Sequence, residues 1–508
     1  MLKRIEPWFW VLAAILLSRF IGMTLFPLVD TTEPRYAEIA RLMAETGDWI
    51  TPWFEPGTPF WGKPPLSFWA QAASLKLFGL SEFSLRLPAW FATIGIVWLT
   101  WCLAKHARGA VVARWSILVL STMALTYISA GAVMTDTFLV FGTTLSLVSV
   151  WFVLSGRSEY WRWWFFVGLA IGLLSKGPLA VVLTVTPLVL WAAIFRQRLQ
   201  PLKKLPWLLG SLLTLLIALP WYVLAELKTP GFLNYFIIGE HFSRFLDPGW
   251  AGDLYGSAHN RPKGMIWIFW LWASFPWGII GLVGFGFAAA RGKTKDIFTD
   301  AAQDASTLYL VFCAITPMLF FTLAGNTLWT YVLPSLPFSA ILIAGWVSHL
   351  DLRPWSRIRL GAVWLAPIVI TLFVFIGVSG VKPLKTEKQL ISRYESIRRE
   401  GDSPIFYIGE MPFSARFYSL GDAVEVTPTE FDSLLETDGY DRVFAAIPNH
   451  EVNDFLNRQS ADAEKLGENK RYQLFSINLP PTNSQNDSVD SDLNSKVTIQ
   501  LPLCNKAC

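Results

Sequence analysis

The segment from Trp8 to Leu28 is almost uninterrupted in its apolar character and is long enough to cross a bilayer as a helix. Similar apolar blocks recur along the chain, and only 16% of its residues are charged, against about 25% in typical soluble domains. The sequence therefore predicts a polytopic α-helical membrane protein with about 11–13 transmembrane helices. The predicted spans are residues 8–28, 86–104, 112–131, 134–154, 162–175, 177–195, 206–226, 266–290, 306–324, 330–349 and 360–380.

The basic residues predict how these spans are oriented, because cytoplasmic loops carry an excess of Lys and Arg. Lys3 and Arg4 precede the first predicted span, and the later basic clusters fall in loops on the same side of the membrane. These clusters lie at residues 105–114, 196–204, 291–295 and 353–359. We therefore expect a cytoplasmic N-terminus and an extracytoplasmic segment after residue 381.

The chain changes in character after residue 380. The segments PIFYIG, AVEVT and RVFAAIP have the pattern of short buried strands, and helical stretches such as FSARFYSL separate them. This alternation predicts a soluble extracytoplasmic α/β domain over residues 381–480, after a transmembrane domain of residues 1–380. Residues 481–508 read as a polar tail, to which we assign no structure.

The first outer loop, residues 29–85, begins with VDTTEPRYAEIAR, in which carboxylates and arginines are dense. Apolar and charged side chains then alternate at helical spacing, which predicts an amphipathic helix lying flat on the membrane surface, with Thr32 as its N-cap. The expected apolar face carries Tyr36, Ile39, Ala40 and Met43, and the expected polar face carries Glu38, Arg41 and Glu45.

The N-terminal end of this helix would place Asp30, Glu33 and Arg35 at the lip of the bilayer. Another carboxylate, Asp136 in AVMTDTF, lies at the outer end of the predicted span 134–154. Helix-end electrostatics could explain the acidic pair, and Asp136 could be only an N-cap. Two acidic sites at one depth with basic groups around them favour a functional site instead.

Several basic residues lie near the membrane ends of the outer segments, where few are expected. They are Lys63 in PFWGKPPLSFW, Lys176 in LLSKGPLA, Arg244 in EHFSRF, and Arg261 and Lys263 in HNRPKG. Snorkelling at the interface could account for any one of them. As a group they predict the capture of an anion at the outer leaflet, and a lipid-linked phosphate is the natural anion at that position.

The loop DTTEPRYAEIARLMAETGDWITPWFE, followed by GKPPLSFW, resembles the membrane aminoarabinose transferase family, which is related to the protein O-mannosyltransferases among the C-type glycosyltransferases. The likeness continues through MTDTF, LLSKGPLA, EHFSRF and NTLWTYVLP. It implies an enzyme that takes a sugar from a polyprenyl (undecaprenyl) phosphate donor on the outer face of the bacterial inner membrane. The implied acceptor is a glycolipid, as in lipid A and lipopolysaccharide modification, or another envelope molecule.

The resemblance also implies roles for individual residues. The first-loop acids Asp30 and Glu33 match the catalytic carboxylate region, and Asp136 matches its second aspartate. The residues implied to bind the donor lipid phosphate are Lys63, Arg244, Tyr331, Arg35 and Tyr36, with Lys176, His241 and Glu240 as further candidates.

Two departures from the family pattern affect these roles. The family usually reads Asp-Glu-x-Arg-Tyr, whereas here Thr32 precedes Glu33 and the aspartate is Asp30, so the catalytic acid could be either carboxylate. The family also has a glutamate, associated with a metal site, where this chain has Gly62. No cofactor is therefore predicted, and a divalent cation is left open. Both departures favour a related transferase with a different sugar or acceptor.

Transfer of a sugar from a lipid phosphate has chemical requirements that do not depend on the family resemblance. Displacing a phosphate from an anomeric carbon requires stabilisation of the leaving charge, which Lys and Arg supply. A hydroxyl acceptor also requires a general base, whereas a phosphate acceptor does not, and a single displacement inverts the anomeric centre. The alternative function is a transporter or flippase of lipid-linked sugars, although no internal repeat of that class is evident. We expect membrane lipids and no nucleic acid among its partners.

Overall fold

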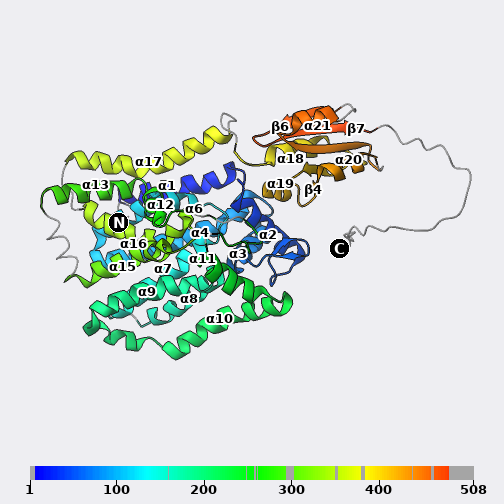
Figure 1. The fold of residues 1–508 in the computed structure, drawn as a ribbon. Coiled ribbons are helices and arrows are strands. Elements are labelled where there is room, and N and C mark those ends of the chain that lie inside the picture. The colour runs from blue at the N-terminus through cyan, green and yellow to red at the C-terminus, as the bar shows by residue number, and fades with distance from the viewer. Residues whose placement is uncertain are drawn as a thin grey trace, which may run out of the picture.

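The computed structural model describes residues 6–479, except for 158, 248, 257–258, 260, 293–302, 349–352, 379–383, 437–438 and 459–462. A body of apolar helices fills most of the molecule, and a smaller sheet-containing domain lies beyond one end of it (Figure 1). The long helices of the body are α1 (Pro7–Leu25), α4 (Glu82–Arg108), α5 (Ala110–Thr122), α7 (Asp136–Leu154), α8 (Trp161–Lys176), α9 (Leu179–Ile194), α10 (Trp207–Lys228), α12 (Met265–Ala273), α13 (Trp277–Ala290), α15 (Ala305–Thr322), α16 (Leu336–Ser348) and α17 (Arg353–Val378).

Six helical segments of the described residues are long and apolar enough to cross a membrane, or up to seven if the pair α12 and α13, bent by 108°, forms one span. Shorter apolar helices occupy Ala110–Thr122, Leu179–Ile194 and Gly361–Leu372. The prediction of a polytopic helical membrane protein is confirmed. The number of 11–13 crossing helices stays a prediction, because several predicted spans form helices that are shorter than a full crossing.

Small residues bring α7 and α8 into close contact. A Cβ atom added at Gly142 would lie 2.6 Å from the carbonyl oxygen of Gly168, and one added at Gly168 would lie 2.3 Å from the Ser146 hydroxyl. Helices in lipid gain stability from such close packing, because the hydrophobic effect provides no drive for one apolar helix to leave lipid for another. This packing fixes the end of α8, where Lys176 is located, relative to the start of α7, where Asp136 is located.

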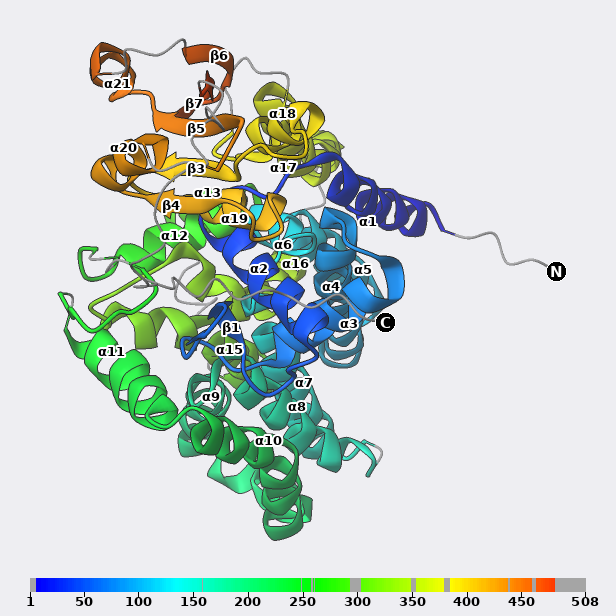
Figure 2. The ribbon, with the colours of Figure 1, turned by 90° about the vertical axis from the view of Figure 1, so that its right-hand side faces the viewer.

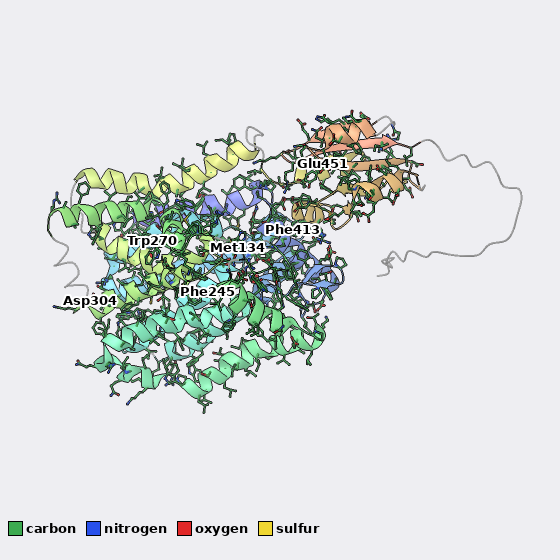
Figure 3. All side chains as sticks on the ribbon, viewed as in Figure 1. Met134, Phe245, Trp270, Asp304, Phe413 and Glu451 are labelled. Atoms are coloured by element: carbon green, nitrogen blue, oxygen red, sulfur yellow. The ribbon has the colours of Figure 1, made fainter. Side chains whose placement is uncertain are left out.

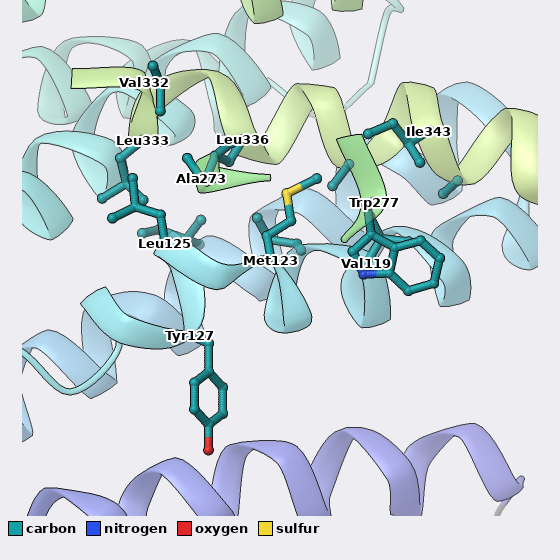
Figure 4. Packing of buried hydrophobic residues seen from close by; sticks show 14 of the residues in the cluster. Val119, Met123, Leu125, Tyr127, Ala273, Trp277, Val332, Leu333, Leu336 and Ile343 are labelled. Carbon is teal, nitrogen blue, oxygen red and sulfur yellow. The ribbon is translucent and has the colours of Figure 1, made fainter. Parts of the chain in front are cut away.

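The largest apolar cluster joins α5 to α16 through α6 (Ala124–Ser129), α12 and the 3₁₀ helix η4 (Trp329–Ser335). Figure 4 shows Met123 and Trp277 inside this cluster, while Tyr127 points towards α1. The Tyr127 hydroxyl lies 3.0 Å from that of Ser18, and the Trp277 indole donates to the Thr122 hydroxyl at 2.8 Å. Polar groups among the helices therefore have internal partners, as a membrane interior requires.

The first outer loop forms α2 (Thr32–Thr46), the short strands β1 (Trp53–Glu55) and β2 (Thr58–Pro59), and α3 (Leu66–Phe78). The expected amphipathic helix forms, but the expectation that its polar face is exposed is wrong for Glu38 and Arg41, whereas the Glu45 side chain is 55% exposed. Glu38 is 2% exposed and Arg41 is 4% exposed, and the Arg41 guanidinium donates to both Glu38 oxygens at 2.6 and 2.7 Å. The predicted cap is also wrong, because the helix begins at Thr32 itself and no side chain caps it.

The C-terminal domain packs against α2, and a Cβ atom added at Gly421 would lie 3.4 Å from Arg41 Nη2. Helix α19 (Phe413–Tyr418) packs against α2, and Phe417 lies in the same apolar cluster as Tyr36 and Met43. Figure 2, seen from the side of the C-terminal domain, shows α19 directly beside α2. In Figure 3, Phe413 lies on the side of the sheet domain that faces the helices, and Asp304 lies at the opposite end of the helical body from Glu451.

The C-terminal domain has one mixed sheet in the order β4-β3-β5-β7-β6. The three predicted strands form β3 (Ile405–Ile408), β4 (Val424–Val426) and β5 (Arg442–Pro448), and they pair in parallel. Two strands that the sequence reading missed, β6 (Ala463–Glu468) and β7 (Tyr472–Asn478), extend the sheet in antiparallel pairing. Helices α18 (Lys388–Ile397), α19, α20 (Pro428–Glu436) and α21 (Val452–Arg458) complete the domain. The predicted tail, residues 481–508, lies outside the described residues.

Candidate functional site

A cavity of about 380 Å³ lies where the helical body meets its outer loops. Six of the residues predicted for the site line it: Lys63, Lys176, Glu240, His241, Arg244 and Tyr331. Most of the other lining residues are apolar, among them Leu179, Val182, Phe242, Phe320 and Phe321. A cationic group of side chains thus adjoins an apolar wall, which suits a phosphate carried on a hydrocarbon chain.

Irregular backbone carries most of these side chains. Lys63 lies in the turn between β2 and α3, and Lys176 is the last residue of α8. Glu240 and His241 lie in the π-helix η3 (Asn234–Ser243), and Arg244 begins the short helix α11 (Arg244–Leu246). Non-helical backbone at membrane depth is tolerated where it lines a cavity, and π-helical turns are frequent at functional sites.

The stretch NTLWTYVLP holds Arg244 in place from the other side of the cavity. The Asn326 amide donates to the backbone carbonyl of Arg244 at 2.8 Å and to that of Asp247 at 3.2 Å. Tyr331, in η4, faces the same cavity. Three segments far apart in the sequence therefore converge around one space.

Glu240 joins two of the cations. Its carboxylate accepts from Lys63 Nζ at 3.1 Å and from Arg244 Nη1 at 2.9 Å. Arg244 Nη2 also lies 3.2 Å from Asp253. Burial disfavours the ionised form of Glu240, but Lys63 and Arg244 outweigh that effect and hold the pKa of Glu240 below its ordinary value. The carboxylate is therefore charged at neutral pH.

Lys176 and Asp136 form a second buried pair. Lys176 Nζ donates to Asp136 Oδ1 at 2.6 Å, and the two side chains are 8% and 11% exposed. The same ammonium lies 5.0 Å from the centre of the Tyr331 ring. Asp136 begins α7, so the predicted N-cap role is not its position, and its carboxylate instead orients a cavity lysine.

His241 is held by backbone. Its Nδ1 lies 2.7 Å from the Phe236 carbonyl oxygen, and its Nε2 lies 3.1 Å from that of Lys176. Burial is the main cause that lowers the pKa of His241, so the ring is neutral at neutral pH. A neutral ring carries a single N–H, so only one of these two carbonyl oxygens accepts a hydrogen bond from His241.

The side chains around Gly62 and the cavity do not form a ligand set for a divalent cation. In the described ranges, no three His, Cys, Asp or Glu side chains are grouped so that they could hold a metal ion. A Cβ atom at Gly62 would lie 2.8 Å from the Phe60 ring, so a glutamate there would require that ring to move. The steps proposed below therefore use no metal.

Asp30 lies outside this cavity. Its side chain has no exposed surface and accepts from the Ser414 backbone N–H at 2.9 Å, from the Ser414 hydroxyl, and from Arg471 Nη2 at 2.6 Å. Arg471 also donates to Glu387 at 2.8 Å. Asp30 therefore does not line the cavity, because the C-terminal domain binds both of its oxygens, and its catalytic role stays a prediction.

Glu33 is bound as well. It pairs with Arg86 at 2.8 and 3.1 Å and accepts from the Val133 backbone N–H at 3.0 Å. Arg35 instead donates to the Tyr255 carbonyl at 2.5 Å and stacks over Tyr36. Tyr36 is buried against Phe60 and Phe68. None of these first-loop residues lines the 380 Å³ cavity.

Sequence reasoning missed several partners of the site. Arg86 is a single arginine at the start of a predicted span. A charge at that position indicates an ion-pair partner, so this contact could have been predicted. Asp253 carried no such signal, because it acts through a contact with Arg244 that no local pattern reveals, whereas Asn326 lies in the stretch NTLWTYVLP that the resemblance includes. Arg471 was missed with the strand β7, which it precedes.

Comparisons with known proteins agree with this arrangement. Residues 8–236 match the family described as dolichyl-phosphate-mannose-protein mannosyltransferase. The chain is 28% identical over 388 residues to the undecaprenyl phosphate-alpha-4-amino-4-deoxy-L-arabinose arabinosyl transferase 1 of Pseudomonas fluorescens, a match covering 72% of this chain and 63% of that protein. It is 30% identical over 326 residues to the corresponding transferase of Aeromonas hydrophila, covering 63% of this chain and 56% of that one.

The chain thus spans less than two thirds of the length of these relatives. Among solved structures, it is similar to ArnT from Cupriavidus metallidurans bound to undecaprenyl phosphate, with a TM-score of 0.72 and 18% identity over 92% of this chain and 97% of that one. At this identity the likeness establishes the fold. The chain therefore has the fold of that structure, and its residues 8–236 match the protein mannosyltransferase family.

Proposed function

We propose that this protein is a membrane glycosyltransferase that takes a sugar from a polyprenyl phosphate and passes it to a glycolipid or another envelope acceptor. One observation carries the proposal: Lys63, Lys176 and Arg244 come from three distant segments and line one otherwise largely apolar cavity. The names of the relatives and the undecaprenyl phosphate in the ArnT crystal structure support the same donor class.

The donor phosphate would compete with Glu240 for its two cations. Glu240 lies between Lys63 and Arg244, where phosphate oxygens would accept from both. We infer that the phosphate takes over these two hydrogen bonds while the polyprenyl chain follows the apolar wall. The same cations then stabilise the charge that develops on the leaving phosphate. Tyr331 would orient the phosphate from the opposite side.

The three candidate carboxylates differ in the residues that bind them. Asp30 and Glu33 are each bound by residues outside the cavity, whereas Asp136 contacts Lys176 inside it. We propose that Asp136 positions Lys176, and that Asp30 and Glu33 fix the first loop. An acceptor that attacks through a phosphate oxygen requires no general base, so this arrangement favours an anionic acceptor over a hydroxyl.

We further propose the location and division of the chain. The basic loops support a bacterial inner membrane protein with a cytoplasmic N-terminus and an extracytoplasmic C-terminal domain. Residues 1–380 would form the transmembrane domain, residues 381–480 the soluble domain, and residues 481–508 the tail.

The decisive experiment is an assay of the purified full chain in detergent with a radiolabelled polyprenyl-phosphate sugar and an extract of envelope glycolipids. A transferase forms labelled glycolipid under these conditions. A flippase only moves lipid between the two leaflets of a bilayer, which detergent does not provide, and it forms no labelled glycolipid. Product that is absent with wild-type protein, in an extract that supports a known transferase, would contradict the proposal. Mass spectrometry of the product then identifies the sugar and the acceptor.

A further inference from the structure

A second and larger cavity, of about 650 Å³, lies apart from the site described above and shares no lining residue with it. It follows the faces of α1 and α4, which pack against each other and against α5 (Figure 2). Its body is apolar and aromatic and includes Trp8, Leu12, Val97 and Trp98. One end is cationic and includes Lys105 and Arg157. We call this space the α1–α4 groove.

The α1–α4 groove has the depth of one leaflet. It extends along α4 from Lys105 to Ile94, and eleven residues of α-helix span about 16 Å. Half of a bilayer's hydrocarbon core is about 15 Å. The cationic end coincides with the N-terminus of α1 and the C-termini of α4 and α7, where helices meet the membrane surface.

The two cations of the groove lack anionic partners. Other arginines at this end are paired: Arg108 lies 2.9 Å from Asp304, and Arg114 lies 2.6 Å from Glu6. In contrast, Lys105 and Arg157 have no ion-pair partner within the described part of the chain. Each lies over an aromatic ring, Lys105 over Trp101 at 5.2 Å and Arg157 over Phe152 at 4.9 Å. These contacts hold the charges beside the apolar wall.

We propose that the α1–α4 groove binds one anionic glycerophospholipid of the leaflet next to the basic loops. The phosphate of the lipid lies between Lys105 and Arg157, and an acyl chain lies along the aromatic wall down to Ile94. Charge complementarity selects an anionic headgroup over a zwitterionic one, and the depth of the groove matches an acyl chain of one leaflet. This proposal is independent of the proposed enzymatic function.

Native mass spectrometry of the full chain in detergent tests the proposal, with equimolar phosphatidylglycerol and phosphatidylcholine as probes. The wild-type protein should retain phosphatidylglycerol preferentially. The double variant Lys105→Gln with Arg157→Gln should bind it more weakly, on the order of tenfold or more, since two charges near the headgroup are lost. The matched control is Lys203→Gln with Lys204→Gln, which removes two charges from another basic loop and should bind as the wild type does.

Three outcomes would overturn the inference. Equal retention of both phospholipids by the wild type would show that no charge is recognised. An equal loss of phosphatidylglycerol binding in both double variants would show that basic side chains attract the lipid to the protein surface in general, and not to the α1–α4 groove. Displacement of phosphatidylglycerol by an equimolar polyprenyl phosphate would assign the groove to the other phosphate-bearing lipid. All the exchanged side chains are exposed and none lies in the donor cavity, so donor turnover provides an independent check that the variants are folded.

Discussion

Asp30 and Arg471 are 441 residues apart in the sequence, and their side chains form a hydrogen bond of 2.6 Å. The aspartate belongs to the loop that follows the first helix, and the arginine directly precedes the last described strand. The contact therefore joins the loop after the first helix to the sheet-containing C-terminal domain.

The first prediction concerns this contact. Arg471→Ala removes a charge-assisted hydrogen bond from Asp30 and one from Glu387, so it should destabilise the domain interface by about 1–3 kcal/mol and lower the melting temperature. Arg398→Ala is a suitable control, because its ion pair with Asp422 lies on the surface of the same domain and should contribute little. Equal melting temperatures for the Arg471 variant and the wild type, by differential scanning fluorimetry, would contradict the prediction.

The donor cations give the second prediction. Lys63→Ala and Arg244→Ala should each lower kcat/KM for the polyprenyl-phosphate donor roughly tenfold to a hundredfold, since each loses a hydrogen bond to a charged group. Lys76→Ala removes a charge from the same outer loop as Lys63, outside the cavity, and should leave kcat/KM unchanged. Values within twofold of wild type for both cavity variants would remove these residues from the site.

A third prediction ranks the carboxylates. Asp136→Asn leaves the buried Lys176 ammonium without its counter-charge and should lower kcat more than KM changes, on folded protein. Asp30→Asn should instead keep most of kcat while it lowers thermal stability, because its partners are in the C-terminal domain. The decisive measurement is kcat at matched amounts of monodisperse protein. A larger loss of kcat in the Asp30 variant would restore that residue as the catalytic acid.

Glu387 gives a pH-dependent prediction. Burial is the main cause that raises the pKa of Glu387 above its ordinary value of 4.5, with Asp30 adding to the rise and Arg471 opposing it. The folded protein therefore binds more protons than the unfolded chain between 4.5 and the raised pKa, so stability falls as the pH rises through that interval. Glu387→Gln removes this titration. The melting temperature of this variant minus that of the wild type should rise with pH above 4.5 and then level off. A difference that does not change with pH would contradict the prediction.

The orientation of the chain gives the last prediction. An alkaline phosphatase fused after Glu387 should be active, because the basic loops place that residue on the extracytoplasmic side. The same reporter fused after Arg157 should be inactive, since Arg157 adjoins a basic loop. The opposite pattern of activities would invert the proposed topology.

The sequence predicted the cavity better than it predicted the first loop. Lys63, Lys176 and Arg244 each stand out locally, because a charge beside a membrane span requires an explanation wherever it occurs. In contrast, the helical pattern of the first loop predicted that Glu38 and Arg41 are exposed residues of an amphipathic helix. The C-terminal domain that packs against this helix comes much later in the chain, and helical periodicity carries no information on such a partner. For the same reason the interface position of Asp30 could not be read from its neighbours.

The burial of α2 beneath α19 has a consequence for how the protein is made. Asp30 leaves the ribosome 384 residues before Ser414, which is about 20 to 80 s at ordinary rates of synthesis. In the proposed topology the first loop reaches the extracytoplasmic side during that interval, before the residues that bind Asp30 have been translated. The loop therefore acquires its final surroundings only when the last strands emerge, and a chain that stops before Arg471 would leave Asp30 without its charged partner.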